Sequence, residues 1–346
     1  MRFLKNPMTT LRNETYEQRA KIYLKRTGLD KSDVRLTHLK GDASSRHYMR
    51  LTFPDESSRI LLLHETAINS DNLPFLNVSE LLIQMSIRIP TVHDKVEDLG
   101  ILVLDDLGDT TLFEFTKTAS LDECREAYTE AIKIIVRLQQ QGKQLASNSY
   151  LPFSQALDEE KLNWELKFFL DYFLIMYSRV NISATARKAL EDDFRKLSKL
   201  LAHETQVLCH RDYHSRNLMH HQGNLFVIDF QDALMGPDTY DLVSLLKDCY
   251  LEHNDSFIQE MLDYYHHQMG ITMRSNFYAS FELMSLQRHL KALGTFGYQA
   301  AKLGNQSYVT DIPRTTRYIE KACKQLPQFA RLRDMLNTYT SHVSRG

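Results

Sequence analysis

The segment VLCHRDYHSRNLMHHQGNLFVIDF, residues 207–230, constrains the fold of this chain more than any other stretch. It is mostly apolar, yet it places Asp212, Asn217 and Asp229 at the ends of its apolar runs. An unpaired carboxylate inside a protein core is strongly destabilising, so these polar side chains need a partner, most simply a cation. The segment therefore predicts a binding site that the fold encloses.

Short strands frame this site. VLCH and NLFVID are continuous apolar runs of strand length, and the HQGN sequence between them is a turn signal. We expect these two strands to be joined through that turn. The arrangement would leave Asp212 and Asn217 on a loop and Asp229 at the end of a strand.

The rest of the chain divides into a strand-rich and a helix-rich part. Two short strands are expected in VRLTHLKGDASSRHYMRLTF, a third in RILLLHE, and a buried one in ILVLDDLGD, which stops at Leu107. Helical periodicity of apolar residues predicts helices over 14–28, 75–85, 121–140, 158–178, 184–203, 241–251, 256–268 and 277–302. We predict an α+β chain with a small β-rich N-lobe, residues 1–107, and a larger, mainly α C-lobe, residues 108–346.

The charge balance and the cysteines argue against several classes of protein. Lysine and arginine number 42 and aspartate and glutamate 44, so the chain lacks the basic excess of a nucleic-acid-binding protein. No apolar run approaches the roughly 20 residues of a membrane span. Four widely spaced cysteines form no CxxC pair, which is typical of free thiols in a reducing compartment. We expect a cytoplasmic monomer that acts on a small molecule and binds neither nucleic acid nor membrane.

The polar trio has the chemistry of phosphoryl transfer. Such a reaction needs a carboxylate that accepts the proton of the attacking hydroxyl, and hard oxygen ligands for Mg²⁺. HRDYHSRN and IDF resemble the catalytic loop and metal-binding Asp of the protein-kinase-like fold, and IDFQDALMGPDTYDLVSLL resembles its aminoglycoside phosphotransferase branch. The resemblance implies that Asp212 is the catalytic base and that Asn217 and Asp229 hold Mg²⁺. Asp241 begins an apolar helix and is interpreted as structural, either a helix N-cap or a brace for the catalytic loop.

The same resemblance implies a nucleotide site for ATP in the N-lobe and at its border. Its candidate residues are those of the loop over the phosphates, the helix glutamate and the hinge to adenine: Gly41, Asp42, Ala43, Ser44, Arg46, Glu80, Asp105 and Leu107. Backbone N–H groups and small side chains suit phosphate oxygens. An exposed helix glutamate such as Glu80 is otherwise only a solvated charge.

One departure from the kinase pattern concerns the third strand. Kinases place there a lysine that neutralises the nucleotide phosphates, but RILLLHETAI contains none, and His64 ends it. Arg46, Arg50 or Arg59 is expected to replace this charge, and Arg46 is the best placed because it belongs to the phosphate loop.

The acceptor is suggested by a resemblance that covers nearly the whole chain. GDASSRHYMR, LDDLGD, HRDYHSRNLM, QRHLKALG and DIPR resemble segments of the bacterial anomeric sugar kinases that phosphorylate N-acetylmuramate and N-acetylglucosamine at C1 in cell-wall recycling. His214, Arg216, Asp232 and Arg288 are the candidate sugar-binding residues. The C-terminal region also offers Lys291 and Arg314, which suit a neutral or anionic sugar better than a polycation. Taken singly, Arg288 and Lys291 each fit the solvated face of a helix whose leucines form core slightly better than a contact with substrate.

Three alternatives stay open. The acceptor could be another small hydroxyl compound, such as an aminoglycoside, choline or a different sugar. The missing strand lysine is compatible with a pseudokinase that only binds. The side chains His210, Asp212, His214, His220, His221 and Asp229 could form the Zn²⁺ site of a metallohydrolase, although their spacing matches no known array.

Overall fold

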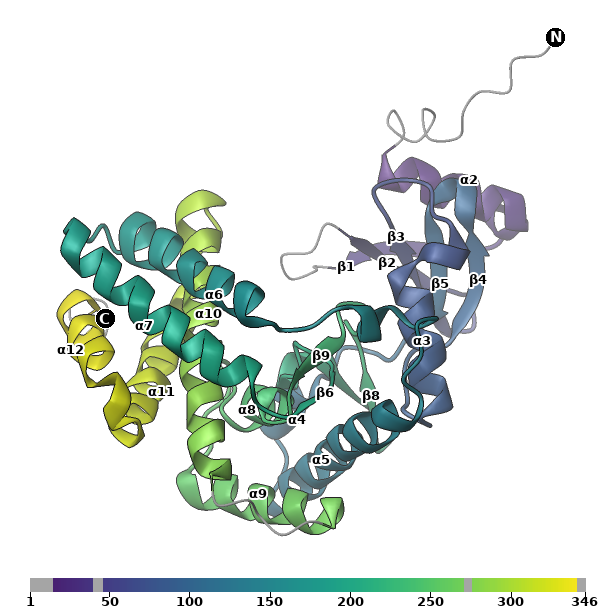
Figure 1. Ribbon diagram of the computed structural model, residues 1–346. Coiled ribbons are helices and arrows are strands. Elements are labelled where there is room, and N and C mark those ends of the chain that lie inside the picture. The colour runs from purple at the N-terminus through teal and green to yellow at the C-terminus, as the bar shows by residue number, and fades with distance from the viewer. Residues whose placement is uncertain (1–14, 40–45, 271–275, 341–346) are drawn as a thin grey trace.

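The computed structural model of the chain describes residues 15–39, 46–270 and 276–340. Its N-terminal part contains a five-stranded antiparallel sheet in the order β1-β2-β3-β5-β4 (Figure 1). The strands are β1 (Arg35–Leu39), β2 (His47–Thr52), β3 (Ser58–Leu63), β4 (Val92–Val96) and β5 (Ile101–Asp105). All the strands predicted for this part are present, and β4 is an additional one.

The two faces of this sheet pack against different helices because successive strand residues point to opposite sides. On one face, Leu61 and Leu63 of β3 pack in a small core with Tyr23 of α2 (Tyr16–Thr27). On the other, Leu62 packs in the main core with Phe75 of α3 (Pro74–Gln84). The predicted opening helix is confirmed as α2, which starts at a Thr15 capping box and ends at Gly28 in the left-handed conformation.

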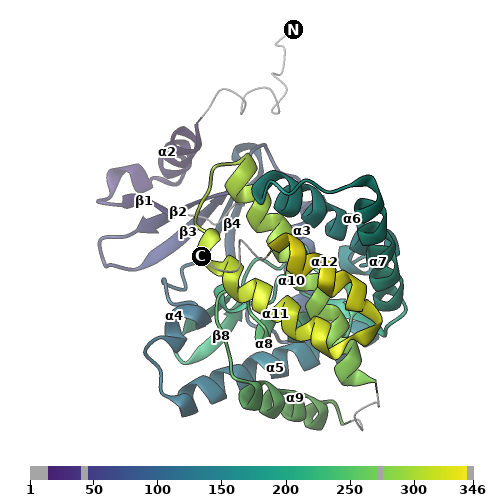
Figure 2. The ribbon, with the colours of Figure 1, turned by 90° about the vertical axis from the view of Figure 1, so that its left-hand side faces the viewer.

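Helices form most of the remaining chain. They are α4 (Leu112–Thr116), α5 (Leu121–Gln144), α6 (Glu159–Phe168), α7 (Ala184–Ala202), α8 (Tyr240–Leu246), α9 (Asp255–Met269), α10 (Phe277–Lys302), α11 (Ile312–Gln325) and α12 (Ala330–Thr340). The predicted helix over 158–178 continues from α6 into a π-helical segment, Phe169–Tyr177. Helix α11 packs on α10, and α12 packs on α11 and α7 (Figure 2).

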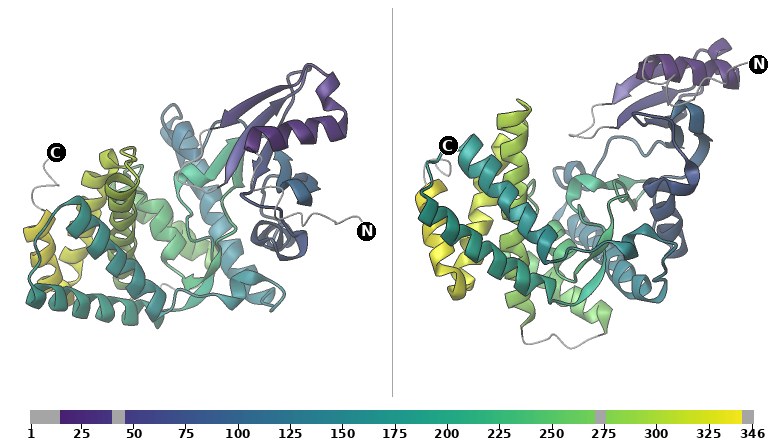
Figure 3. Two further views of the ribbon diagram at one scale, coloured as in Figure 1. Left: turned by 90° about the horizontal axis from the view of Figure 1, so that it is seen from above. Right: turned by 45° about the horizontal axis from the view of Figure 1, so that its top comes forward.

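Four short strands lie between the sheet and the helices α10 to α12, as both views in Figure 3 show. They are β6 (Gln206–Cys209), β7 (Leu218–His221), β8 (Asn224–Val227) and β9 (Leu234–Pro237). The expected connection of the first apolar run to NLFVID through HQGN is wrong: β6 pairs with β9, and the HQGN turn joins β7 to β8. The catalytic-loop candidate therefore runs from β6 to β7, two strands of different ladders.

The lobe boundary at residue 107 remains a proposal. It agrees with the positions of the elements, because β5 ends at Asp105 and α4 begins at Leu112. The main hydrophobic core is nevertheless continuous across it, since Leu104 of β5 and Leu112 of α4 belong to one buried cluster. None of the helices in the described ranges combines the length and apolar character that a membrane crossing requires.

Helix α10 approaches the π-helical segment so closely that glycine is required at the contact. A Cβ atom on Gly297 would lie 2.6 Å from the carbonyl oxygen of Tyr172 and 2.7 Å from Cα of Phe173. Since both are main-chain atoms, the clash cannot be relieved by a side-chain rotation.

We therefore expect Gly297→Ala to lower the free energy of unfolding, by about 1–3 kcal/mol, as overpacking does. The sign is informative because alanine favours an isolated helix over glycine by about 1 kcal/mol. Chemical denaturation measures the change, and Lys302→Ala, an exposed site on the same helix, serves as the control. A Gly297→Ala protein as stable as the parent would contradict the close packing of α10 against this segment.

Candidate active site

Two buried carboxylates fix the backbone of the loop between β6 and β7. Asp241 accepts hydrogen bonds from the backbone N–H of His210 at 2.7 Å and of Arg211 at 3.1 Å, and Asp248 accepts one from Ser215 N–H at 2.8 Å. Both carboxylates are 1% exposed, and burial raises the pKa of each. Asp241 is thus the brace that the sequence suggested; the N-cap position of α8 belongs to another residue, Thr239. Asp248 was not recognised from the sequence.

Asp212 lies on this loop with its side chain beside a cavity of about 80 Å³. Lys291 of α10 donates a hydrogen bond from Nζ to its Oδ1 at 3.0 Å. Burial alone would raise the pKa of Asp212, but the charges of Lys291 and Arg288 outweigh it and hold the pKa well below its usual range. The carboxylate is therefore ionised and is 32% exposed. The cavity is lined by Asp212, His214, Asp248, Cys249, Tyr250, Arg288, Lys291, Ala292, Thr295 and Phe296.

Asn217 and Asp229 line a second, larger hollow next to this cavity, which we call the cleft. Nδ2 of Asn217 donates to the carbonyl oxygen of Asp212 at 2.9 Å, so its amide oxygen is left to accept another group. Asp229 has φ of 60°, in the left-handed region that non-glycine residues rarely adopt. Such strain persists only where the surroundings enforce it, and it is common at functional sites. Gln231 Nε2 donates to Asp229 Oδ1 at 2.7 Å, and Arg46 Nη1 lies 3.8 Å from the same oxygen.

The cleft has a volume of about 430 Å³ and separates the sheet from the helical part. Residues from both parts line it: Leu39, Tyr48, Ile60, Phe75, Pro90, Leu104, Asp105, Asp106, Leu107, Gly108, Asp109, Thr111, Arg216, Asn217, Met219, Ile228, Asp229, Phe230 and Gln231. Two of the predicted hinge residues, Asp105 and Leu107, are among them. The Asp105 carboxylate is already occupied by Thr91 N–H at 3.0 Å and His93 Nε2 at 2.6 Å. Any contact of this residue with a ligand therefore falls to its backbone.

The structure favours one of the three arginines that could replace the charge of the missing strand lysine. Ile60 of β3 lines the cleft, and Leu62, which follows it on the same face, is fully buried in the main core. Arg50 is engaged elsewhere, in ion pairs with Asp106 at 2.5 Å and Asp109 at 2.8 Å. Of the three arginines considered, Arg46 is the one that lies next to Asp229.

Some predicted site residues do not line the cleft or the cavity. Glu80 is exposed on α3, because that helix directs Phe75, Val78 and Leu82 into the core and Glu80 to solvent. Phe75 is the α3 residue that reaches the cleft, where its ring packs on Phe230 at a centroid distance of 4.9 Å. Asp232 is also exposed and lines neither hollow. The proposed phosphate-loop residues Gly41, Asp42, Ala43 and Ser44 lie outside the described residues.

The remaining acceptor candidates gather around the cavity. His214 and Arg288 line it, and burial lowers the pKa of His214 to about 3, so this imidazole is neutral at physiological pH. Arg216 lines the cleft, and its guanidinium carbon lies 3.7 Å from the ring centroid of Tyr250, which lines the cavity. Arg216 therefore marks the border between the two hollows.

Lys291 is the site residue whose position the sequence left most open. The available signal was its spacing from Arg288 on a leucine-rich helix, because two cations three residues apart on a helix that packs in the core need a polar partner. The partner is Asp212, 79 residues earlier in the chain.

The described residues do not support a zinc site. Within them, no group of three or more His, Cys, Asp and Glu side chains is arranged to hold a metal ion. His210, a member of the proposed array, instead directs Nε2 to the carbonyl oxygen of Ile228 at 3.0 Å, where it links the catalytic loop to the segment before Asp229.

Known proteins resemble this chain in sequence and in structure. An N-acetylmuramate/N-acetylglucosamine kinase of Neisseria meningitidis is 32% identical over 315 residues, which cover 88% of this chain and 90% of the relative. One of the same name from Pseudomonas aeruginosa is 31% identical over 301 residues, 85% of this chain and 86% of the relative. A choline/ethanolamine kinase family protein of Mesorhizobium loti superposes with a TM-score of 0.59 at 17% identity, covering 95% of this chain and 99% of that one.

A second solved structure, the ADP-bound aminoglycoside phosphotransferase APH(2'')-Ib, superposes with a TM-score of 0.58 at 16% identity, covering 86% of this chain and 97% of that one. At such identities the likeness shows the fold, a protein-kinase-like two-lobe α+β architecture, as predicted. Residues 35–275 match the sequence profile of the phosphotransferase enzyme family, and this span is more than half of the chain. With its sequence relatives alike over most of their length, the chain belongs to the phosphotransferase enzyme family and is a kinase that transfers phosphate to a hydroxyl group.

Proposed function

We propose that the protein is an ATP- and Mg²⁺-dependent kinase that transfers the γ-phosphate to the anomeric hydroxyl of N-acetylmuramate or N-acetylglucosamine. The observation that carries this proposal is the meeting of the two hollows: Asp212 borders the smaller cavity, and Asn217, hydrogen-bonded to its backbone, lines the cleft. A nucleotide in the cleft and a sugar at the cavity would thus meet at Asp212. The names of the sequence relatives supply the two sugars.

Asp212 acts as the base in this proposal. Its ionised carboxylate accepts the hydrogen bond, and then the proton, of the sugar hydroxyl that attacks the phosphorus atom. An anomeric hydroxyl is more acidic than a primary alcohol, so a carboxylate with a low pKa is an adequate base. The loose transition state of phosphoryl transfer depends more on orientation than on deprotonation.

Asn217 and Asp229 fit a magnesium ion. Both provide hard oxygen donors, both line the cleft, and the orientation of the Asn217 amide leaves its oxygen towards a ligand. When bound, Mg²⁺ neutralises charge on the nucleotide phosphates. Asp105 and Leu107 would meet the adenine through their backbone, and the loop that ends at Arg46 would cover the phosphates.

The charge of the acceptor cavity favours this class of substrate over the alternatives. Arg288 and Lys291 line it, and both keep their positive charge because nearby acidic groups outweigh the effect of burial on their pKa values. A polycationic aminoglycoside or the quaternary ammonium group of choline would meet repulsion there. The carboxylate of N-acetylmuramate would be attracted by these two cations, and N-acetylglucosamine, which is neutral, would be neither attracted nor repelled.

A blocked sugar tests the proposal. With ATP and Mg²⁺, both free sugars should yield a product whose phosphorus couples to the anomeric proton in ³¹P–¹H NMR. Methyl N-acetylglucosaminide has no anomeric hydroxyl and should yield none. Phosphorylation of this glycoside, or a phosphate on C6 of the free sugar, would overturn the assignment. A protein that binds ATP but phosphorylates no acceptor would support the pseudokinase alternative.

Arg46→Ala should weaken ATP binding roughly ten- to a hundredfold, because a charge-assisted contact with phosphate contributes about 1.5–3 kcal/mol. Isothermal titration calorimetry with ATP and Mg²⁺ measures this. Arg59→Ala is the matched control. Arg59 lies on β3, which pairs with β2, the strand that Arg46 precedes, and its Nη1 donates to the Ser58 carbonyl. An equal loss of affinity in both variants would assign no special role to Arg46.

A further inference from the structure

We propose that Lys291 is a catalytic residue whose ammonium group contacts the γ-phosphoryl group while it passes from the nucleotide to the acceptor. The inference deepens the proposed function, on which it rests. The starting observation is the contact between Nζ of Lys291 and Oδ1 of Asp212, 3.0 Å apart beside the acceptor cavity.

The contact with Asp212 limits how far Lys291 can lie from the reacting atoms. A hydroxyl that donates to the Asp212 carboxylate has its oxygen about 2.8 Å from a carboxylate oxygen. The ammonium nitrogen therefore lies within roughly 8 Å of that hydroxyl oxygen even in the least favourable geometry, and within roughly 6 Å when both groups share Oδ1. The flexible four-carbon stem of a lysine can cover the remaining distance to a phosphoryl oxygen.

Residues other than Lys291 hold the backbone of the catalytic loop in place. Asp241 and Asp248 already fix the loop through its backbone N–H groups, and Asn217 holds the carbonyl of Asp212. Lys291, in contrast, contacts the side chain of Asp212, the part of the residue that takes part in the reaction. A cation at that position acts on the reacting carboxylate and not on the conformation of the loop backbone.

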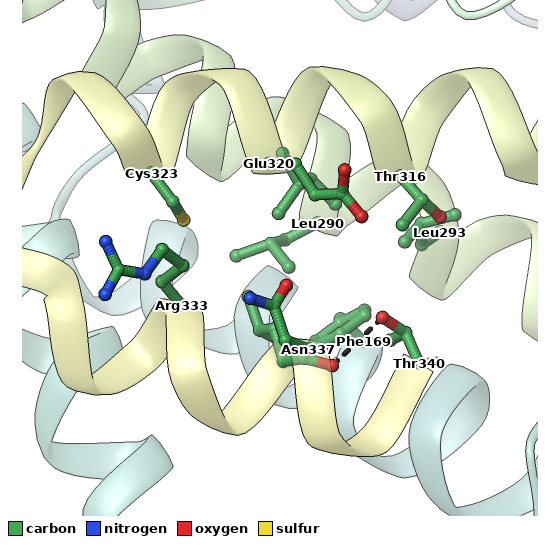
Figure 4. A pocket seen from close by; sticks show the side chains of 11 residues that line it. Phe169, Leu290, Leu293, Thr316, Glu320, Cys323, Arg333, Asn337 and Thr340 are labelled. Carbon is green, nitrogen blue, oxygen red and sulfur yellow. Dashed lines mark hydrogen bonds between the residues drawn. The ribbon is translucent and has the colours of Figure 1, made fainter. Parts of the chain in front are cut away.

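The part of helix α10 that carries Lys291 is tightly packed. Leu290 and Leu293, on either side of Lys291 in the sequence, are fully buried and border a narrow space between α11 and α12 (Figure 4). Gly294 and Gly297 bring the helix against the π-helical segment. The stem of Lys291 thus starts from a part of the helix that is packed on several sides, while the side chain lines the cavity and is 18% exposed.

The charge of Lys291 is maintained in the resting enzyme. Burial lowers the pKa of Lys291, but the carboxylate of Asp212 more than compensates, so the pKa lies above its ordinary value. The third strand contains no lysine, so Arg46 is the cation proposed for the nucleotide phosphates on the sheet side. Lys291 approaches from the opposite side, from the C-lobe.

The step that Lys291 assists is a balanced transfer. The bond between the γ-phosphorus and the oxygen that bridges it to the β-phosphorus breaks, and ADP leaves with that electron pair. The oxygen of the sugar hydroxyl forms a new bond to the phosphorus, and its proton passes to Asp212. Negative charge on the equatorial oxygens of the phosphoryl group is stabilised by the ammonium of Lys291, which exchanges one oxygen of Asp212 for one of the phosphoryl group.

The test compares Lys291→Met, Lys291→Arg and a control, Lys302→Met, which changes an exposed lysine on the same helix. Removal of one preorganised charge donor typically lowers kcat by about 10²- to 10³-fold. We expect such a loss for Lys291→Met with both sugars, a KM for ATP within a few-fold of the parent, partial recovery in Lys291→Arg, and no change in Lys302→Met.

Two further measurements separate this role from others. Thermal melting should show that Lys291→Met is folded, and the slow hydrolysis of radiolabelled ATP without a sugar should fall in proportion to the sugar kinase activity. Turnover within threefold of the parent would overturn the inference, as would a defect confined to the KM of N-acetylmuramate, which would make Lys291 a carboxylate-binding residue. If the parent protein phosphorylates neither sugar, the proposed function fails, while unequal ATP hydrolysis by the parent and Lys291→Met still decides the role of Lys291.

Discussion

Asp212→Asn is expected to lower kcat by roughly 10²- to 10⁴-fold, the usual contribution of a general base, while ATP affinity changes little. The carboxylate borders the acceptor cavity and is not among the residues that line the cleft, so its loss should spare the nucleotide. Asparagine has nearly the same shape and can still accept a hydrogen bond from Lys291, but it cannot take a proton. Steady-state kinetics with each sugar, together with calorimetric titration of ATP, measures the two effects separately.

Asp263→Asn is a suitable control, because Asp263 is an exposed residue of α9 that accepts a hydrogen bond from Gln259 at 2.8 Å. It should behave like the parent in both assays. Turnover of the Asp212→Asn protein within a few-fold of the parent would show that another group accepts the proton. A parallel loss of ATP affinity would instead mean that the substitution disturbs the loop, including the bond from Asn217 to the Asp212 carbonyl.

The polar trio stands out in the sequence because its members lie close together along the chain. Asp212 and Asn217 are five residues apart on one loop, and Asp229 follows a hairpin that is itself short. Polar residues between apolar runs are visible without knowledge of the fold, since their burial requires a partner. Apolar periodicity, which is also a local signal, identified the opening helix, and the structure shows that this helix runs from a Thr15 cap to Gly28.

Other features depend on contacts between distant parts of the chain, which a pattern in one segment cannot reveal. Strand β6 pairs with β9 across more than twenty residues, although the nearer run of NLFVID looked like its natural partner. Lys291 becomes a site residue only because α10 packs beside the catalytic loop. Glu80 shows the converse, because its place in the sequence matched a known pattern while the helix directs it to solvent.

Asp229→Ala is expected to remove the dependence of nucleotide affinity on Mg²⁺ and to lower turnover by roughly 10³-fold or more, since a metal ion contributes several kcal/mol of charge stabilisation in such reactions. The two effects on affinity have opposite signs. With Mg²⁺ present, the variant lacks a ligand and should bind ATP more weakly than the parent. In the presence of EDTA, it lacks a carboxylate that repels the phosphates, and Arg46, 3.8 Å from Asp229 in the parent, can turn to them, so it should bind ATP at least as well.

Calorimetric titrations of ATP with Mg²⁺ and with EDTA, for the parent, Asp229→Ala and Asp263→Ala, give the required comparison. In the parent and the Asp263→Ala control, Mg²⁺ should strengthen binding; in Asp229→Ala the two affinities should converge. If Mg²⁺ strengthens binding to Asp229→Ala as much as to the parent, the metal is held elsewhere and the positive φ of Asp229 needs another explanation. Convergence would instead link the backbone strain at this residue to the cation, because only a carboxylate aimed into the cleft can serve as its ligand.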